Sequence, residues 1–192
     1  MKKLLSLLLL GMMCMPVFAQ NAEKLYTEGK ALYDAKNYKA AYVKLKAAAD
    51  EGHKKAQYRL GRLFDKGNGV SENNKQAFYW YLKSAEQGFA KAQYQVGKSY
   101  KNGEGVEEDR DKAFQYFKLA AEQGNGDAQF ALAKCYMKGK GCAVDLDKAK
   151  EWFLLAFKNE KDGKEILQVV REEASYRDAD AKAILKLTGI SK

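Results

Sequence analysis

Few side chains in the sequence have the types and spacing that chemistry requires. His53 is the only histidine, and Cys135 and Cys142 are the two cysteines outside the N-terminal segment. A histidine beside a thiolate could act as a base and nucleophile pair, and imidazole and thiolates could bind zinc. One histidine and two cysteines leave a four-ligand zinc site incomplete without carboxylates, and no other residue supports a dyad. We therefore interpret His53 as an exposed residue in a turn.

Two further patterns resemble parts of functional motifs. The pairs Asp109-x-Asp111 and Asp145-x-Asp147 resemble the opening of a calcium-binding loop, but the glycine and the distant glutamate that complete it are missing. Recurring Gly-x-Gly pairs suggest phosphate binding, yet no strand is expected before them and none of them is followed directly by Gly-Lys-Ser/Thr. The sequence also lacks the Ser-x-x-Lys and Gly-x-Ser-x-Gly motifs of serine nucleophiles. We therefore expect no catalytic residue, no cofactor and no metal.

The first residues differ in character from the rest of the chain. Residues 1–19 combine a basic start, an apolar core and small residues before their end, which is the pattern of a secretory signal peptide. Their apolar run is shorter than the about 20 residues that a membrane anchor needs, and the residues before Cys14 match a lipoprotein signal poorly. We expect cleavage near Ala19, export to the periplasm or beyond the cell, and no membrane span.

The remaining sequence is organised by a repeat of 36 residues. The same residue types return at fixed positions, as in Ala56, Ala92 and Ala128; Tyr58, Tyr94 and Phe130; Gly61, Gly97 and Ala133; and Trp80, Tyr116 and Trp152. The loop Gly67-x-Gly69-Val70 likewise returns as Gly103-x-Gly105-Val106 and Gly139-x-Gly141-Cys142. So many positions in step across three units indicate a repeat architecture.

Each repeat is predicted to be a pair of helices, A and B. Between Ala56 and Phe64 the repeated positions follow the spacing of one helix face. The Gly-x-Gly pair ends helix A, because glycine accepts a left-handed turn and costs a helix interior about 1 kcal/mol. Asp109 and Asp145 stand where helix B begins, and a carboxylate there caps the open amides. A glycine such as Gly88 closes the unit.

A shorter unit is expected before these repeats and two closing helices after them. Gly29 and Ala41 are 12 residues apart, whereas Gly61 and Ala77 are 16 apart, so the first unit lacks the Gly-x-Gly insertion. The closing helices are predicted at Asp162–Ala174 and Asp178–Thr188, with a polar outer face. The predicted segments are a signal peptide at 1–19, a helix pair at 20–52, repeats at 53–88, 89–124 and 125–160, and capping helices at 161–192.

The repeats carry a resemblance to a known family. The segment AQYRLGRLFDKGNGVSENNKQAFYWYLKSAEQG and its copies from Ala92 and Ala128 resemble the Sel-one-like repeat (SLR) family, and Glu23–Gly52 resembles a tetratricopeptide repeat. The resemblance implies an all-α fold, a right-handed α-solenoid of antiparallel helix pairs whose A helices line a concave surface that binds other proteins. Exported bacterial members serve envelope signalling, exopolysaccharide secretion and host contact. This sequence departs from the pattern at Ala133, Cys142 and Glu160.

The resemblance also implies which residues line the concave surface. They lie at fixed distances from the helix A glycine, and those expected to bind a partner are Tyr26, Lys30, Tyr58, Arg62, Tyr94, Lys98, Lys101, Phe130, Lys134 and Lys138. Charged residues at all the implied positions are nine basic and four acidic, so +5 of the +7 charge left after signal-peptide removal is expected there. Aromatic rings would supply contact area beside these cations. Alternatively, the aromatic residues partly pack on the neighbouring repeat.

Several partners suit such a surface. We expect an acidic or extended protein or peptide, with anionic polysaccharide as another possibility, and the oligomeric state stays open. Nucleic acid is not expected, because the chain is predicted to be exported and lacks a recognised nucleic-acid module. The main expectation is a non-catalytic interaction or adaptor module of the bacterial cell envelope. The alternatives are a hydrolase that acts on the cell wall or on β-lactams, with which some relatives have been associated, and a structural subunit of an envelope assembly.

The two remaining cysteines have two interpretations. An even number of cysteines in an exported protein permits a disulfide between Cys135 and Cys142, and some secreted members of the family link their repeats in this way. Alternatively both are small apolar side chains in the core, since Cys142 stands where the other repeats have valine.

Overall fold

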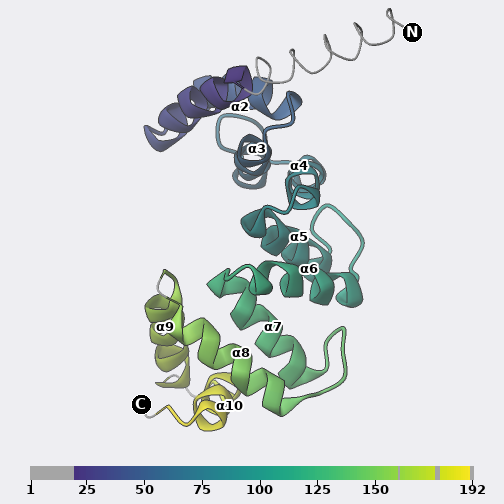
Figure 1. Cartoon of the computed structure of the whole chain (residues 1–192), viewed down its shortest axis with the longest axis vertical. Coiled ribbons are helices and arrows are strands. Elements are labelled where there is room, and N and C mark those ends of the chain that lie inside the picture. Colours follow the sequence, from purple (N-terminus) through teal and green to yellow (C-terminus); the bar gives the residue numbers. More distant parts are fainter. Residues whose placement is uncertain (1–19, 160, 176–177, 191–192) are drawn as a thin grey trace, which may run out of the picture. The chain divides into compact units, whose positions relative to one another are not determined.

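The computed structural model describes residues 20–159, 161–175 and 178–190, and all of its regular structure over these ranges is helical. The expected signal peptide at residues 1–19 and the alternative lipidation at Cys14 lie outside the described residues. A first helix spans residues 20–34. It is followed by α2 (Tyr38–Asp50), α3 (Lys54–Lys66), α4 (Asn74–Glu86), α5 (Ala90–Asn102), α6 (Arg110–Glu122), α7 (Gly126–Lys138), α8 (Leu146–Lys158), α9 (Gly163–Ser175) and α10 (Ala179–Thr188), as Figure 1 shows.

The helices form the predicted pairs. Helices α3, α5 and α7 are the A helices, and each packs on the B helix that follows it, α4, α6 and α8. Helices α3 and α7 also pack on the preceding helices α2 and α6. The closing helices α9 and α10 pack on each other and on α8. The all-α repeat predicted from the 36-residue period is therefore confirmed.

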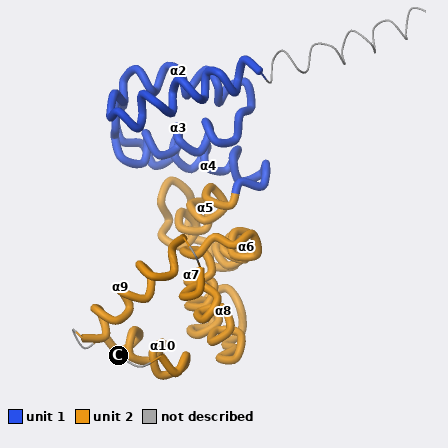
Figure 2. The backbone as a smooth tube through the Cα atoms, turned by 60° about the vertical axis from the view of Figure 1, so that its left-hand side comes forward, with its two compact units in different colours: residues 1–89 blue, residues 90–192 orange. Residues whose placement is uncertain are grey.

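The chain divides into two compact units at the boundary between the first two 36-residue repeats. Unit 1 comprises residues 1–89, and unit 2 comprises residues 90–192 (Figure 2). Of the described residues, unit 1 contains the first helix with α2, α3 and α4, whereas unit 2 contains α5 to α10. Each unit has its own buried core.

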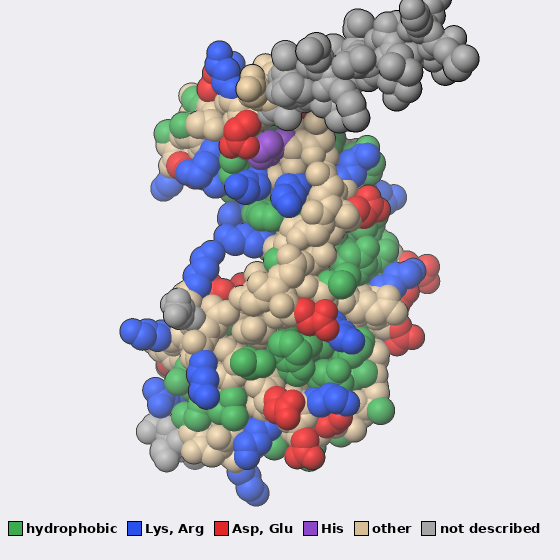
Figure 3. All heavy atoms as spheres, in the orientation of Figure 1, with side chains coloured by type: hydrophobic (Ala, Val, Ile, Leu, Met, Phe, Trp, Pro, Cys, Tyr) green, Lys and Arg blue, Asp and Glu red, His purple; other side chains and the backbone are tan. Residues whose placement is uncertain are grey.

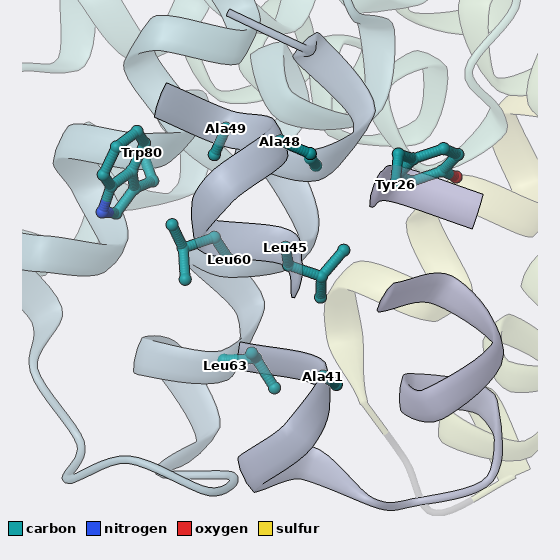
Figure 4. Packing of buried hydrophobic residues seen from close by; sticks show 9 residues of the cluster. Tyr26, Ala41, Leu45, Ala48, Ala49, Leu60, Leu63 and Trp80 are labelled. Atoms are coloured by element: carbon teal, nitrogen blue, oxygen red, sulfur yellow. The ribbon is translucent and has the colours of Figure 1, made fainter. Parts of the chain in front are cut away.

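The core of unit 1 lies between the first helix, α2, α3 and α4. Leu45, Leu60 and Leu63 are fully buried, and small residues such as Ala41 and Ala48 let the helices approach closely (Figure 4). Burying a leucine side chain contributes about 1.5–3 kcal/mol. The core of unit 2 is built in the same way, from small residues of the A helices and large aromatic residues such as Phe117 and Phe153 of the B helices.

The Gly-x-Gly loops end the A helices as predicted, and they also fit one repeat onto the previous one. Gly139 and Gly141 have φ values of 64° and 73°, which lie in the left-handed region. A Cβ atom on Gly141 would lie 2.2 Å from the carbonyl oxygen of Arg110, at the start of α6. In unit 1, a Cβ atom on Gly69 would lie 2.6 Å from the carbonyl carbon of Tyr38. The second glycine of these loops therefore permits close contact with the preceding B helix.

The B helices begin at the predicted caps. The side chains of Asn73, Asp109 and Asp145 accept hydrogen bonds from backbone N–H groups three residues later, at 3.0, 2.9 and 2.9 Å. Asp109 and Asp145 also form ion pairs with Lys112 and Lys148. These contacts satisfy amides that have no partner within the helix, so capping explains the aspartate pairs that resembled a calcium loop.

A buried glutamine recurs at the same position in each repeat, and its amide links the repeat to neighbouring helix ends. Gln57, Gln93 and Gln129 are 4, 5 and 8% exposed. Gln57 donates a hydrogen bond to the carbonyl oxygen of Ala49 in α2 (3.1 Å), and its own oxygen accepts one from Gln87 (2.8 Å). Gln87 also donates to the carbonyl oxygen of Gly52 (2.9 Å).

The same arrangement recurs in unit 2. Gln123 donates to Gln93 (2.6 Å), and Gln129 donates to the carbonyl oxygen of Ala121 in α6 (3.4 Å). Asn159 takes the place of the second glutamine in the last repeat and donates to Gly124 and Gln129. A pair of amide side chains therefore ties each closing turn to the A helix of its own repeat. Gln57 and Gln129 also satisfy carbonyl groups at the end of the preceding B helix, α2 and α6 respectively.

Replacing Gln57 by leucine is expected to lower the free energy of unfolding by about 1–2 kcal/mol. The variant keeps the side-chain volume but removes the hydrogen bonds to Ala49 and Gln87 inside the protein, and each such bond contributes about 1 kcal/mol. Urea denaturation followed by circular dichroism measures the change. Gln76→Leu, on the exposed surface of α4 in the same unit, is the control and should be nearly neutral. Equal stability of the Gln57 and Gln76 variants would show that the buried amide is not structural.

The capping aspartates are expected to make stability depend on acid pH. The backbone N–H of Lys112 holds the pKa of Asp109 below its ordinary value of 3.8, and the ammonium group of Lys148 does the same for Asp145. A carboxylate with a lowered pKa in the folded state stabilises above its unfolded pKa, and this stabilisation is lost as the pH falls below about 4. In the Asp109→Asn/Asp145→Asn variant, the cap remains but does not titrate.

Thermal unfolding from about pH 7 to about pH 2 therefore distinguishes the two proteins. The midpoint of the variant should fall less steeply below about pH 4 than that of the wild type. Parallel curves would mean that these caps contribute nothing to the acid sensitivity of the fold.

Candidate binding site

The predicted aromatic positions are partly core positions. Tyr26 is only 8% exposed, and its ring stacks on that of His53 at a centroid distance of 4.4 Å. Tyr58 packs on Tyr81 and Phe89. The assignment of Tyr26 to an open binding surface is therefore wrong, because the turn before α3 covers its ring.

In unit 2 the aromatic rings lie half-buried between the helices. Tyr94 packs on Phe117 at 5.9 Å and Phe130 on Phe153 at 5.3 Å, in each case on the B helix of the same repeat. Burial, and secondarily the charge of Asp127, raises the pKa of Tyr94 to about 12. These rings therefore support the helix pair of their own repeat, whereas the alternative interpretation of the sequence had them pack on the neighbouring repeat.

The predicted cations differ in what they contact. Lys30 forms an ion pair with Asp34 at 2.6 Å, and Lys138 forms one with Asp180 of α10. The Arg62 guanidinium lies 5.7 Å from the ring centre of Tyr33, and the Lys134 ammonium lies 5.7 Å from that of Phe130. Lys101 is exposed, and Lys98 is half-buried on the same helix.

One groove of about 430 Å³ in unit 2 collects five of the ten predicted residues. Tyr94 and Lys101 of α5 lie on one side, and Phe130, Lys134 and Lys138 of α7 lie on the other. Lys98 is not among the lining residues. The groove lies between two successive A helices, and we call it the α5–α7 groove.

The loops and α6 add charged residues that the repeat pattern did not reveal. The α5–α7 groove is also lined by Glu108, Arg110 and Lys140, which flank the Gly-x-Gly loops, and by Asp127 at the start of α7. The sequence-based assignment considered only helix A positions, so it counted Asp127 among the charged positions but missed Glu108, Arg110 and Lys140. In the sequence, the feature that could have indicated them is the cluster of charged residues around each Gly-x-Gly loop. In total, five cations and two carboxylates surround an aromatic floor of Tyr94, Phe117 and Phe130.

Figure 3 shows one face of the molecule in space-filling form. Over the helices of unit 2, hydrophobic side chains reach the surface with acidic and basic side chains around them. Aromatic and apolar area bordered by charged groups is typical of a surface that binds another protein.

Cys135 and Cys142 are free thiols in the structure. Cys135 belongs to the core cluster of α6 and α7, and Cys142 packs against the same cluster. Burial raises the pKa of the Cys135 thiol to about 11 and also raises that of Cys142. Neither thiol therefore has the lowered pKa of a nucleophile. The possible disulfide between them stays a prediction.

His53 is a structural residue rather than an exposed one, so that sequence-based interpretation is wrong. Its side chain is 13% exposed and forms the N-cap of α3, because Nδ1 accepts a hydrogen bond from the backbone N–H of Ala56 at 3.1 Å. Nε2 lies 2.9 Å from the carboxylate of Glu23, and the ring stacks on Tyr26. The imidazole thus connects the first helix to α3.

Over the residues that the structure describes, no group of three or more His, Cys, Asp and Glu side chains is placed to hold a metal ion. In the same part of the chain, no helix is long and apolar enough to cross a membrane.

The geometry defines a helical repeat protein with a groove between its A helices, and comparison with known proteins identifies the repeat. The family model described as Sel1 repeat matches residues 54–89, 90–125 and 126–160. The chain therefore belongs to the Sel1 repeat family and has its α-solenoid fold. Proteins built from these repeats are generally protein-interaction modules and typically non-catalytic scaffolds. No curated protein sequence matches the chain.

Two solved structures are similar over most of the chain. A Sel1 repeat protein from Oxalobacter formigenes is 30% identical, with a TM-score of 0.66, covering 86% of this chain and 78% of its own. The protein c5321, a protective antigen of uropathogenic Escherichia coli strains with an SLR fold, is 27% identical, with a TM-score of 0.71. That match covers 88% of this chain but only 38% of c5321.

Replacing His53 by alanine is expected to lower the free energy of unfolding by about 1–2 kcal/mol. The change removes an N-cap, which contributes about 1 kcal/mol, and a ring contact, which contributes about 0.5–1.5 kcal/mol. His53→Asn keeps a capping acceptor without the ring, so the stability of this variant should lie between those of the wild type and His53→Ala. Urea denaturation at neutral pH ranks the three proteins. If His53→Ala were as stable as the wild type, the cap and the ring contact of His53 would not contribute to stability.

Proposed function

We propose that this protein is a non-catalytic interaction module that binds an acidic, extended segment of a protein partner in the α5–α7 groove. The observation that supports the proposal is the charge of the groove wall, which contains five cations and two carboxylates. Arg110 pairs with Glu108, and Lys138 pairs with Asp180. Lys101, Lys134 and Lys140 form no ion pair among the described residues. Cations above an aromatic floor attract a carboxylate-rich segment and give it a rigid surface to pack on.

The groove is suited to an extended segment rather than to a compact ligand. It follows two neighbouring A helices and has side chains from the loops at its border. Long lysine side chains at such a border steer anionic groups toward the surface and make affinity depend on salt. Protein or peptide is favoured over polysaccharide because proteins built from Sel1 repeats are generally protein-interaction modules.

We also propose that the protein acts in the bacterial cell envelope after export. The support is the signal-peptide pattern of residues 1–19. The c5321 protein, to which the repeats are similar, is a protective antigen of uropathogenic Escherichia coli. In the envelope, an adaptor would hold one protein beside another without changing either chemically.

Reversing two groove charges is expected to weaken binding of an acidic peptide about tenfold or more. The probe is a short fluorescein-labelled peptide of glutamate, phenylalanine and glycine, and fluorescence anisotropy at low salt measures its affinity. Lys101→Glu/Lys134→Glu removes two cations of the groove, and the salt dependence of binding should decrease with the affinity.

The matched control reverses two lysines outside the groove. Lys150→Glu/Lys182→Glu, at exposed positions of α8 and α10, produces the same net charge and should bind the peptide almost as the wild type does. If both double variants lost the same affinity for the peptide, the effect would be due to net charge alone. Binding unaffected by Lys101→Glu/Lys134→Glu would remove the groove from the proposal.

A further inference from the structure

A second groove adjoins the first on the other side of α7. It has a volume of about 310 Å³ and lies between α7 and α9, so we call it the α7–α9 groove. The two grooves share Asp127, Phe130 and Lys134 of α7. Both belong to unit 2, and together they follow three helices, α5, α7 and α9.

The charges of the two grooves are opposite. The α7–α9 groove contains Asp127 together with Asp162, Glu165 and Glu173, whereas Lys134 is its one cation among the lining residues. The α5–α7 groove has five cations and two carboxylates. The sign of the wall charge therefore changes across α7, where Lys134 and Asp127 stand on the same helix.

The carboxylates of the α7–α9 groove are not neutralised by neighbours within it. Asp162 and Glu165 form no ion pair among the described residues. Although Asp127 is exposed at the border, the groove walls partly desolvate it, and this raises its pKa above 3.8, with Asp162 and Glu165 adding to the increase. Like charges held together in this way are relieved by an external cation.

The floor of the α7–α9 groove is apolar. Ile166, Val169 and Val170 of α9 face Phe130 of α7 across it, and Val169 is 45% exposed. The apolar floor is therefore continuous from one groove to the other through Phe130, while the charge of the walls changes. A ligand that crosses α7 would contact one continuous apolar surface, with basic walls on the α5 side and acidic walls on the α9 side.

We propose that the occupant of these two grooves is a charge-bipolar peptide segment, with acidic residues over the α5–α7 groove and basic residues over the α7–α9 groove. The inference rests on the proposed function, because it specifies the partner of the same binding surface. Neighbouring packed helices are about 10 Å apart, and an extended chain advances about 3.3 Å per residue. The acidic and basic groups are therefore separated by about three residues, with an apolar or aromatic residue between them above Phe130.

The experiment compares short labelled peptides by fluorescence anisotropy at low salt. Two of them have a glutamate half and a lysine half joined by a phenylalanine, in the two possible orders, and a third is all acidic apart from the phenylalanine. One of the two bipolar orders should bind the wild type at least about threefold more tightly than the all-acidic peptide does. If neither order exceeds the all-acidic peptide, the bipolar inference is overturned.

Charge reversal on α9 tests the same point from the side of the protein. Glu165→Lys/Glu173→Lys should weaken the preferred bipolar peptide about threefold to tenfold and strengthen the all-acidic one. The control Glu151→Lys/Glu172→Lys has the same net charge, and neither residue lines a groove. If the two double variants change the affinity of the bipolar peptide equally, the α7–α9 groove does not hold its basic half.

The all-acidic peptide separates failure of this inference from failure of the proposed function. If the all-acidic peptide binds the wild type but not Lys101→Glu/Lys134→Glu, the α5–α7 groove is its binding site. This result does not depend on how the bipolar peptides bind. If no peptide binds the wild type, both the proposed function and the bipolar inference are overturned. Circular dichroism of every variant confirms that the helices remain folded.

Discussion

The buried amide pair is the interaction on which the repeats depend. A glutamine inside a helical interface is costly unless its donors and acceptors are satisfied, and Gln57 is satisfied by Ala49 and Gln87 only when the neighbouring helix ends lie in one arrangement. Apolar packing alone tolerates small rotations of one helix on another, whereas a hydrogen-bonded amide does not. The repetition of the pair at Gln93 and Gln129 therefore fixes the closing turn on the A helix within each of these repeats.

The geometry of the repeats places residues that recur in the sequence along one surface. Because the amide pairs and the Gly-x-Gly loops position each repeat within its unit, the equivalent residues Tyr94 of α5 and Phe130 of α7 line the same groove. The aromatic residues illustrate how one position serves two purposes, since Tyr94 and Phe130 pack on B-helix rings and still border the groove. The proposed binding surface is thus formed by residues that also belong to the packing of the helix pairs.

The 36-residue period was sufficient to predict the helix pairs, the glycine loops and the caps, because each of these depends on local backbone chemistry. It was not sufficient for Tyr26 and His53, whose contact joins the first helix to α3 and has no counterpart in the repeat pattern. Arg110 and Lys140 were missed because only the folded loops bring them beside the A helices. The acidic contribution of α9 was missed because this helix follows the last repeat and does not share its periodicity.

The second glycine of the Gly-x-Gly loop bears on how repeats can be added to the chain. The contact between Gly141 and the backbone of Arg110 involves no side chain of either residue, and each repeat has an amide pair, with Asn159 in place of the second glutamine in the last one. The last repeat thus contacts the one before it through a loop glycine and a buried glutamine that the preceding repeat also has, as Gly105 and Gln93. A duplication of 36 residues in frame would create a joint of a kind already present, so the length of the array is free to change by whole units while α9 and α10 remain its end.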